Sequence, residues 1–294
     1  MENNTSFFFQ IFSCCVPKHD KSEKNTNVDL IHETKEEEQV EKPVSNHNNE
    51  KPEASQTNDF QETLPPTINN QIFPQKFIRK EEEEVISFTK NGILDFYSKI
   101  KNLQYEKIVN QNGLLLEINK EGSTFRKDLF VAHSHYIVPK SSFKKAPSTQ
   151  LIADTIFKPE YRKKWDDSLQ IVEIMEQISP EAFIVHTMSN KQMMIISERE
   201  AYDKRCEFYH DGIYYNFSSS VPEELYPSNP DAVRVRNYFN FYSIKEDEEK
   251  FTFEVYNQVD IKMKVPPSLL NIMFPGRITD MKMKMQVVID EIMK

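Results

Sequence analysis

A long series of alternating apolar and polar residues between positions 105 and 262 limits the folds that this chain can adopt. Alternation with a period of two is typical of strands, and the alternating segments are 105–109, 114–119, 125–139, 168–178, 182–190, 202–208, 213–221, 232–244 and 250–262. Short turns join many of them, and Asn112-Gly113 and Asp211-Gly212 are dipeptides that favour two-residue hairpins. Consecutive strands joined by such turns pair antiparallel. The sequence therefore predicts an antiparallel sheet of about eight or nine strands.

A helical insertion interrupts this series of strands. Ser148 is a suitable N-cap for a helix that starts at Thr149. Pro159 ends that helix, because proline has no N–H and restricts the residue before it. A second short turn, 160–165, leads to the acidic pair Asp166-Asp167. We expect a helix, one further helical turn and then a strand.

Helices are also predicted at both ends of the region. In 80–102 a broad apolar face follows the four glutamates 81–84, whose charge favours a helix N-terminus, whereas Gly92 weakens the helix. The last segment starts at Pro266-Pro267 and carries an apolar stripe with a period close to 3.6 residues. Pro275-Gly276 is expected to break or kink it. Such a stripe needs an apolar surface to lie on.

Composition excludes several classes of protein. The 46 acidic residues outnumber the 37 basic ones, whereas a general nucleic-acid binder needs a basic surface. Three cysteines cannot build a disulfide framework, which indicates a reducing compartment. No apolar run approaches the ~20 residues that span a bilayer. We expect a monomeric cytoplasmic protein without a nucleic-acid partner.

The first 77 residues differ in composition from the rest. Residues 1–18 combine an aromatic patch with the adjacent Cys14 and Cys15, the pattern of an S-acylated anchor that would make the protein a peripheral membrane protein. A terminus whose cysteines have no such role has the same appearance. Residues 19–77 are polar and charged and contain no glycine, so we expect a disordered tether. The folded domain is expected to span 78–294.

Four sequence motifs occur in the order in which START domains carry them. They are Tyr161-Arg162-x-x-Trp165-Asp166, Ser197-x-Arg199-Glu200, Ser219-Ser220-Val221-Pro222 continuing to Val233-Arg234-Val235, and Asp260 through Val265-Pro266 to Leu270-Asn271. The chain thus resembles the START family, lipid-transfer domains related to the steroidogenic acute regulatory protein, and within it the phosphatidylcholine transfer branch. The resemblance covers 78–294 and implies an α+β helix-grip fold. In this fold a curved antiparallel sheet surrounds a long C-terminal helix and leaves a lipid tunnel.

The resemblance also implies where a lipid would bind. The residues expected at the lipid head group are Arg162, Asp166, Arg199 and Tyr202, and those expected in the cavity or its lid are Trp165, Met273, Met281, Met285 and Ile289. Arg162 would donate charge-assisted hydrogen bonds to a phosphate, and Asp166 would hold that guanidinium or meet a cationic head group. Two other interpretations remain open. Arg162 and Asp166 can form a structural salt bridge, and Arg199, like Arg234, can belong to the framework of the sheet.

Three departures from the family pattern are visible. Lys262 or Met263 replaces the glycine that precedes the last helix, and residues 191–194 replace a Pro-x-Pro segment. Residues 186–188 and Ala201 stand where a choline binder has aromatic residues. A quaternary ammonium group needs an aromatic cage, so the resemblance does not extend to choline specificity.

These observations predict a lipid carrier that is not an enzyme. We expect it to hold one phospholipid or sterol beneath the last helix and to move it between cytosolic membrane faces, with transient membrane contact and no cofactor. The alternatives are a membrane-tethered lipid sensor without transport and a helix-grip cyclase or hydrolase. The sequence shows no Ser-His-Asp, Cys-His or metal-ligand spacing, because His133 and His135 lack a third ligand and Cys206 lies in a predicted strand.

Overall fold

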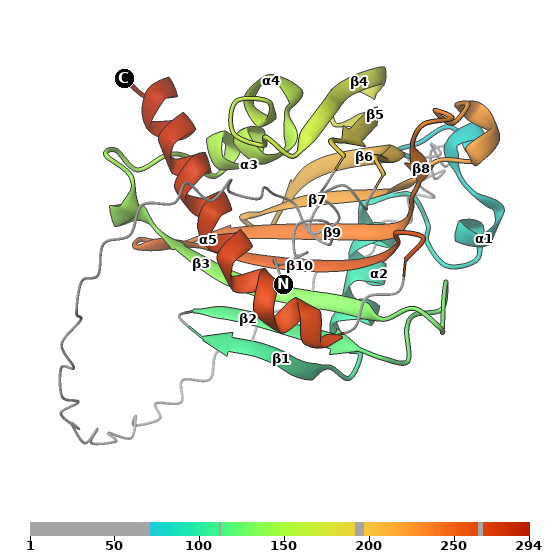
Figure 1. The fold of residues 1–294 in the computed structure, drawn as a ribbon, viewed down its shortest axis with the longest axis horizontal. Coiled ribbons are helices and arrows are strands. Elements are labelled where there is room, and N and C mark those ends of the chain that lie inside the picture. Colours follow the sequence, from blue (N-terminus) through green and yellow to red (C-terminus); the bar gives the residue numbers. More distant parts are fainter. Residues whose placement is uncertain (1–70, 112, 192–196, 264–266) are drawn as a thin grey trace, which may run out of the picture. The chain divides into compact units, whose positions relative to one another are not determined.

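The structure, a computed structural model, describes residues 71–111, 113–191, 197–263 and 267–294 (Figure 1). Cys14 and Cys15, with the predicted anchor and nearly all of the predicted tether, lie outside these residues. Phe73 and Phe77 are buried, so the packed part of the chain begins before Ile78. Within the described residues, no helix is both long and apolar enough to cross a membrane.

The described strands form one sheet, which is antiparallel apart from one short pairing. They are β1 (Glu106–Gln111), β2 (Leu114–Asn119), β3 (Val131–Pro139), β4 (Leu169–Ser179), β5 (Ala182–Ser189), β6 (Arg199–His210), β7 (Ile213–Ser220), β8 (Val233–Arg234), β9 (Arg236–Glu246) and β10 (Lys250–Asp260). Their order is β1-β2-β3-β10-β9-β7-β6-β5-β4, and β8 adds a short parallel pairing to β6. The large antiparallel sheet is confirmed. β4, at one edge, pairs with β5 through three register shifts.

The strand predicted for 125–139 begins only at Val131. The residues before it turn back across the sheet, with Gly122 at a φ of 74°. The side-chain amide of Gln258 donates to the carbonyl oxygens of Arg126 and Leu129, at 2.7 and 2.6 Å. A side chain therefore satisfies carbonyl groups that a strand would have paired with its neighbour.

The single N-terminal helix predicted for 80–102 is wrong. The structure has α1 (Lys80–Glu83) and α2 (Lys90–Lys101), preceded by a short 3-10 helix, Gln75–Phe77. Thr89 caps α2 by accepting a hydrogen bond from the backbone N–H of Gly92 at 3.0 Å. A Cβ at Gly92 would lie 2.2 Å from the carbonyl oxygen of Ser87, so the chain between the helices folds tightly against α2. This close approach therefore requires glycine at position 92.

A buried ionic cluster fixes α1 to the sheet. Glu82 on α1 and Lys204 on β6 are both fully buried, and their charged atoms are 2.6 Å apart. Arg79 donates to Glu82 at 2.8 Å. Burial opposes the ionisation of Glu82, but the charges of Lys204 and Arg79 outweigh it and hold the pKa of Glu82 below its ordinary value. Burial also lowers the pKa of Lys204 to about 8, although Glu82 opposes that change.

Helices cover both faces of the sheet (Figure 1). On one face α2 packs Phe96 against Phe217 and Phe239. On the other face lie α3 (Thr149–Phe157), α4 (Pro159–Arg162) and α5 (Pro267–Ile292). The Ser148 cap is confirmed, since its hydroxyl accepts from the N–H of Leu151 at 3.2 Å. α5 is continuous past Pro275, so this proline does not end the helix.

The inward face of α5 is packed rather than hollow. Met281, Met285 and Ile289 are almost completely buried in one core cluster that also holds Tyr136 and Trp165. The side chain of Met273, the remaining residue predicted for the lid, lies outside the description. Protein side chains therefore fill the described part of the space beneath α5.

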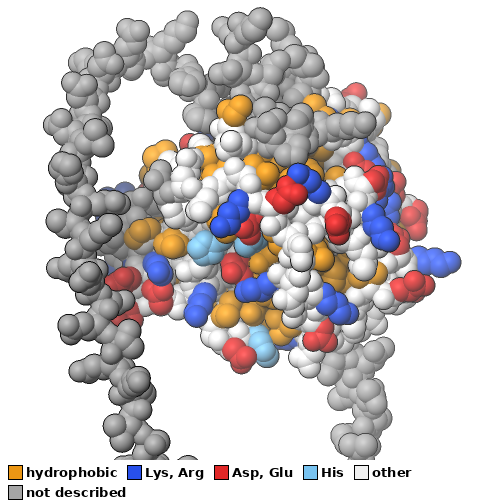
Figure 2. Space-filling view, turned by 90° about the horizontal axis from the view of Figure 1, so that it is seen from below, with side chains coloured by type: hydrophobic (Ala, Val, Ile, Leu, Met, Phe, Trp, Pro, Cys, Tyr) orange, Lys and Arg blue, Asp and Glu red, His pale blue; other side chains and the backbone are white. Residues whose placement is uncertain are grey.

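Apolar side chains also occupy the outward face of α5. Ile272, Met283 and Val287 are 74%, 55% and 57% exposed. Elsewhere the surface is mixed, and Figure 2 shows acidic and basic side chains interspersed on the face seen from below. Ile174 and Met175 on β4 are also exposed, but the three most exposed large apolar side chains of the described residues are those of α5.

Candidate functional site

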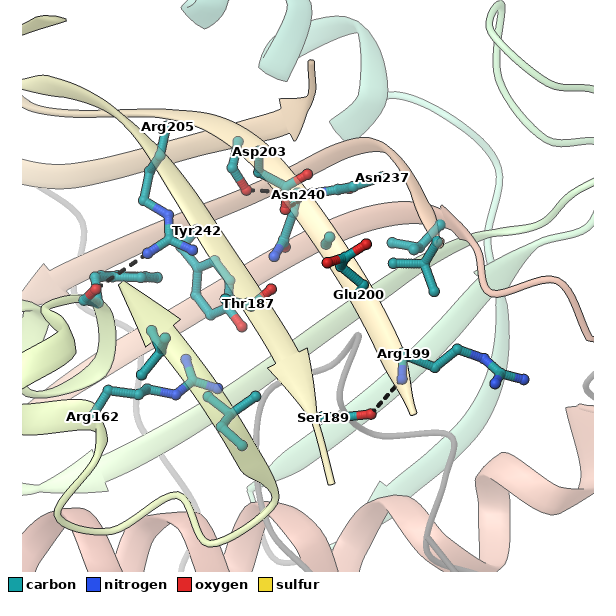
Figure 3. A pocket seen from close by; sticks show the side chains of 17 residues that line it. Arg162, Thr187, Ser189, Arg199, Glu200, Asp203, Arg205, Asn237, Asn240 and Tyr242 are labelled. Atoms are coloured by element: carbon teal, nitrogen blue, oxygen red, sulfur yellow. Dashed lines mark hydrogen bonds between the residues drawn. The ribbon is translucent and has the colours of Figure 1, made fainter. Parts of the chain in front are cut away.

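A cavity lies between the α3–α4 segment and the strands of the same side of the sheet (Figure 3). Its lining comes from α3, α4 and most strands between β4 and β10, namely Phe157, Arg162, Leu169, Val172, Thr187, Ser189, Arg199, Glu200, Ala201, Asp203, Arg205, Ser218, Val235, Asn237, Asn240, Tyr242 and Val259. It encloses about 910 Å³ of atom-free space, its open mouth included, but the centre of a water molecule can reach only about 100 Å³ of it. No described residue of α5 lines this cavity, whereas the sequence places the lipid beneath the last helix.

The end of α3 organises one wall of the cavity. Pro159 has no N–H to bond the carbonyl of Thr155, and the indole N–H of Trp165 supplies that bond at 2.8 Å. The next two carbonyls accept from arginines: Ile156 from Arg162 at 3.0 Å, and Phe157 from Arg205 at 3.2 Å. Cations are favoured at a helix C-terminus, so α3 holds two guanidinium groups at the cavity wall.

Arg162 forms the structural salt bridge that the sequence left open. Its Nε and Nη2 atoms lie 2.7 and 2.6 Å from one carboxylate oxygen of Asp166. The Ser168 hydroxyl donates to the other oxygen at 2.5 Å, and Asp166 is buried. The guanidinium also lies 5.1 Å from the centre of the Trp165 ring. Arg162 lines the cavity with its charge already balanced, while Trp165 is a core residue.

Arg205 is the functional candidate that the sequence did not identify. It lines the cavity, its Nε has no hydrogen-bond acceptor, and no carboxylate oxygen of the described residues lies within 4.0 Å of its guanidinium. Burial lowers the pKa of Arg205, nearby Asp203 opposes this change, and Arg162 adds to it. Alternation along β6 places Ala201, Asp203 and Arg205 on one face, and that was the available signal.

A polar row lies next to Arg205. The carboxylate of Asp203 accepts from the Ser220 hydroxyl at 2.9 Å and from the Asn237 amide at 3.4 Å. Burial raises the pKa of Asp203, although these hydrogen bonds oppose the change. Asn240 points into the cavity from β9 (Figure 3). The row therefore offers both hydrogen-bond donors and acceptors to a polar group.

Arg199 and Glu200 border the opposite end of the cavity (Figure 3). Arg199 donates to the carbonyl oxygens of Ser197 at 2.9 Å and Ile261 at 3.3 Å. It therefore links the chain just before β6 to the chain just after β10. Glu200 accepts from Nε2 of His186 at 3.1 Å and from Arg234 at 3.3 Å. Arg199 thus has the framework contacts that were foreseen and also lines the cavity.

Tyr202 lies on the other face of β6 and does not line the cavity, contrary to its expected place at the head group. It stacks on His186, with ring centres 4.2 Å apart, and on Tyr226 at 4.8 Å. Arg234 covers it at 4.2 Å. Tyr202 follows Ala201 on the strand, so its side chain points to the opposite face of β6, and it is absent from the lining of the cavity.

Two residues considered for metal binding or nucleophilic catalysis, His133 and Cys206, pack within the sheet. His133 bonds Glu117 at 3.1 Å and stacks on Tyr256, and Cys206 is buried, which raises the pKa of its thiol. Across the described residues, no group of three or more His, Cys, Asp or Glu side chains could hold a metal ion.

Comparison with known proteins supports the architecture described above. Human StAR-related lipid transfer protein 5 has a similar structure, with a TM-score of 0.56, 18% sequence identity, and coverage of 69% of this chain and 96% of its own. Human STARD10 is also similar, with a TM-score of 0.53, 17% identity, and coverage of 68% and 79%. At these identities the likeness concerns the fold. A comparison with curated protein sequences gives no match.

The family itself follows from the sequence. A family model described as the START domain matches residues 116–286, which is more than half of the chain. The α+β helix-grip fold expected from the resemblance is confirmed by this match and by the observed sheet and C-terminal helix. This chain belongs to the START domain family.

Proposed function

We propose that this protein binds a single lipid in the cavity, with the polar head group at Arg162, Arg205 and Asp203, and carries it between membranes. The observation that supports this most directly is the combination of charged and apolar side chains in the lining of one cavity. Leu169, Val172, Val235 and Val259 supply apolar wall. Burial of hydrocarbon against such a wall contributes about 0.8 kcal/mol per CH₂ group.

Uptake requires a rearrangement of the cavity wall. The roughly 100 Å³ open to water centres holds several water molecules, whereas a lipid with long chains needs more room. We infer that α5 or the α3–α4 segment moves aside at a membrane surface, so that opening limits the rate of exchange. The exposed apolar residues of α5 supply a surface for transient membrane contact.

The proposal assigns no catalytic step and no cofactor to the cavity. The two carboxylates of its described lining are engaged, Glu200 with His186 and Arg234, and Asp203 with Ser220 and Asn237. Asp166, which lies beside the cavity, is paired with Arg162. General acid–base chemistry needs a group that can exchange a proton with a substrate. We therefore expect a non-enzymatic cytoplasmic carrier of a phospholipid or sterol.

Native mass spectrometry of the full chain purified from its own cells tests the proposal. We expect one lipid molecule per protein chain, released on denaturation and identifiable after solvent extraction. A preparation that carries no lipid and takes none up from vesicles would contradict the proposed function.

A membrane-tethered lipid sensor is the second candidate, because Cys14 and Cys15 adjoin an aromatic patch at the end of a long polar segment. Mass spectrometry of the N-terminal peptide distinguishes the two. Stoichiometric acylation together with absent vesicle-to-vesicle transfer would favour the sensor, and an unmodified peptide with measurable transfer would favour the carrier.

A further inference from the structure

Arg205 is a half-buried residue whose Nε atom is out of reach of solvent, and its charge has no ion-pair partner among the described residues. Its only hydrogen bond within the described residues runs from Nη1 to the carbonyl oxygen of Phe157, at 3.2 Å. Arg162, on the same wall, shows the contrast, since a carboxylate oxygen of Asp166 lies 2.6 Å from its Nη2. A buried cation loses hydration and needs an anion in compensation. The ligand is the component that can supply one.

The charges around the cavity add to the same requirement. Taken with direct ion-pair partners, its described lining contains four guanidinium groups and three carboxylates, namely Arg162, Arg199, Arg205, Arg234, Asp166, Glu200 and Asp203. Of the three carboxylates, Asp203 is the one without a described cation within 4.0 Å. The interior is therefore positive before a ligand enters.

The donors near Arg205 suit an oxyanion. Asn240 extends from β9 into the cavity on the side of Arg205 (Figure 3). An arginine fork with a neighbouring amide matches the several oxygens of a phosphate or carboxylate. A single sterol hydroxyl cannot neutralise the guanidinium charge.

A choline head group fits poorly for a specific reason. Phe157 and Tyr242 are the aromatic residues among the described lining. The guanidinium of Arg205 already lies 5.6 Å from the centre of the Phe157 ring. A quaternary ammonium group at that ring would meet a like charge in a site of low dielectric, which is unfavourable.

We propose that the cavity selects lipids whose head group carries a net negative charge, and that Arg205 is the residue that determines this specificity. The inference depends on the proposed lipid-binding function and narrows its ligand. Arg162 contributes less to this specificity than Arg205, because the carboxylate of Asp166 neutralises the charge of Arg162.

Lipid loading from mixed vesicles tests the inference. The full chain is incubated with vesicles of phosphatidylcholine, phosphatidylethanolamine, phosphatidylglycerol, phosphatidylinositol and cholesterol in equal amounts and re-isolated, and its lipids are quantified. We expect the anionic phosphatidylglycerol and phosphatidylinositol to exceed phosphatidylcholine. In Arg205→Gln, which keeps donors but removes the charge, that ratio should fall by about ten- to a hundredfold. Arg205→Lys should retain most of the preference.

Two further variants keep the test independent of the behaviour of Arg205→Gln. Asp203→Asn removes a carboxylate beside Arg205 and should raise the anionic preference. Lys120→Gln, an equal charge change at a residue whose side chain is 58% exposed and outside the cavity lining, should leave it unchanged.

The outcomes separate this inference from the proposed function. One bound lipid per chain with phosphatidylcholine or cholesterol in excess would overturn the anionic specificity alone. An unchanged ratio in both Arg205→Gln and Asp203→Asn would likewise overturn the role of Arg205. Failure of the wild-type chain to load any lipid would contradict the proposed function and the inference together.

Discussion

At the scale of single residues, we expect buried ion pairs to affect the free energy of unfolding more than exposed ion pairs do. Lys204 and Glu82 are in contact at 2.6 Å with no exposure, whereas Lys76 and Glu176 form an exposed pair at 3.3 Å. Exposed pairs contribute about 0–1 kcal/mol, but loss of one partner from a buried pair leaves an unpaired charge in the interior. The two kinds of pair should therefore respond very differently to substitution.

We expect Lys204→Met to lower the free energy of unfolding by about 3 kcal/mol, because Glu82 would remain buried and charged with Arg79 as its remaining described cationic partner. The double variant Lys204→Met with Glu82→Gln should lose less than the sum of the two single variants. Urea unfolding of all four chains measures both quantities. Lys76→Met is the control and should change stability by less than about 1 kcal/mol.

The same cluster predicts a dependence on acid. The pKa of Glu82 is lowered from its ordinary value of 4.5 in the folded state, so its ionised form stabilises the fold above pH 4.5. That contribution is lost as the pH falls below 4.5 and through the folded pKa. Between pH 7 and pH 3.5 the wild type should lose more stability than Glu82→Gln. Equal losses in the two chains would show that another group governs acid unfolding.

At the scale of elements, Gly92 and Gly276 provide a matched pair of helical glycines. Alanine in place of an unhindered helical glycine stabilises by about 1 kcal/mol. Nothing lies within 4 Å of a Cβ at Gly276 on α5, so Gly276→Ala should stabilise by that amount. A Cβ at Gly92 would meet the Ser87 backbone at 2.2 Å, so Gly92→Ala should destabilise by about 1–3 kcal/mol. Thermal and urea unfolding measure the opposite signs, and two stabilising substitutions would contradict the close contact.

Much of the element order was predictable, because it depends on local residues. Ser148 caps α3, Pro159 ends it, and Asp211-Gly212 forms the hairpin turn with φ values of 50° and 73°. The break between α1 and α2 was not, since it depends on Ile86 and Phe88, which turn inward to a core that only the assembled sheet provides.

The location of the cavity likewise could not be predicted from local sequence. Alternation establishes that Tyr202 and Arg205 lie on opposite faces of β6, but it does not say which face borders a cavity. The family glycine before α5 has a counterpart in Lys262, whose φ is 61°. Lys262 thus adopts a positive φ, a conformation that glycine favours most.

At the scale of the whole molecule, α5 is apolar on both sides. Its inner side packs on the sheet, and its outer side exposes Ile272, Met283 and Val287. We expect the double variant Met283→Glu with Val287→Glu to reduce binding to phospholipid vesicles by at least about tenfold, because it removes two apolar groups from the contact. Vesicle co-sedimentation measures the change. Asn91→Glu with Ser98→Glu, at exposed positions of α2 and with the same added charge, should bind as the wild type does.

An open sheet leaves two borders, and the irregular pairing of β4 affects how molecules of this protein meet one another. Its register shifts between Leu169 and Ile171, between Ile174 and Glu176, and between Gln177 and Ser179. A straight, regular border would present evenly spaced N–H and C=O groups on which a strand of a second molecule could add. The bulged border does not match such a strand. The irregular β4 edge therefore disfavours edge-to-edge association of two molecules through this strand, even while the cavity is open for lipid exchange.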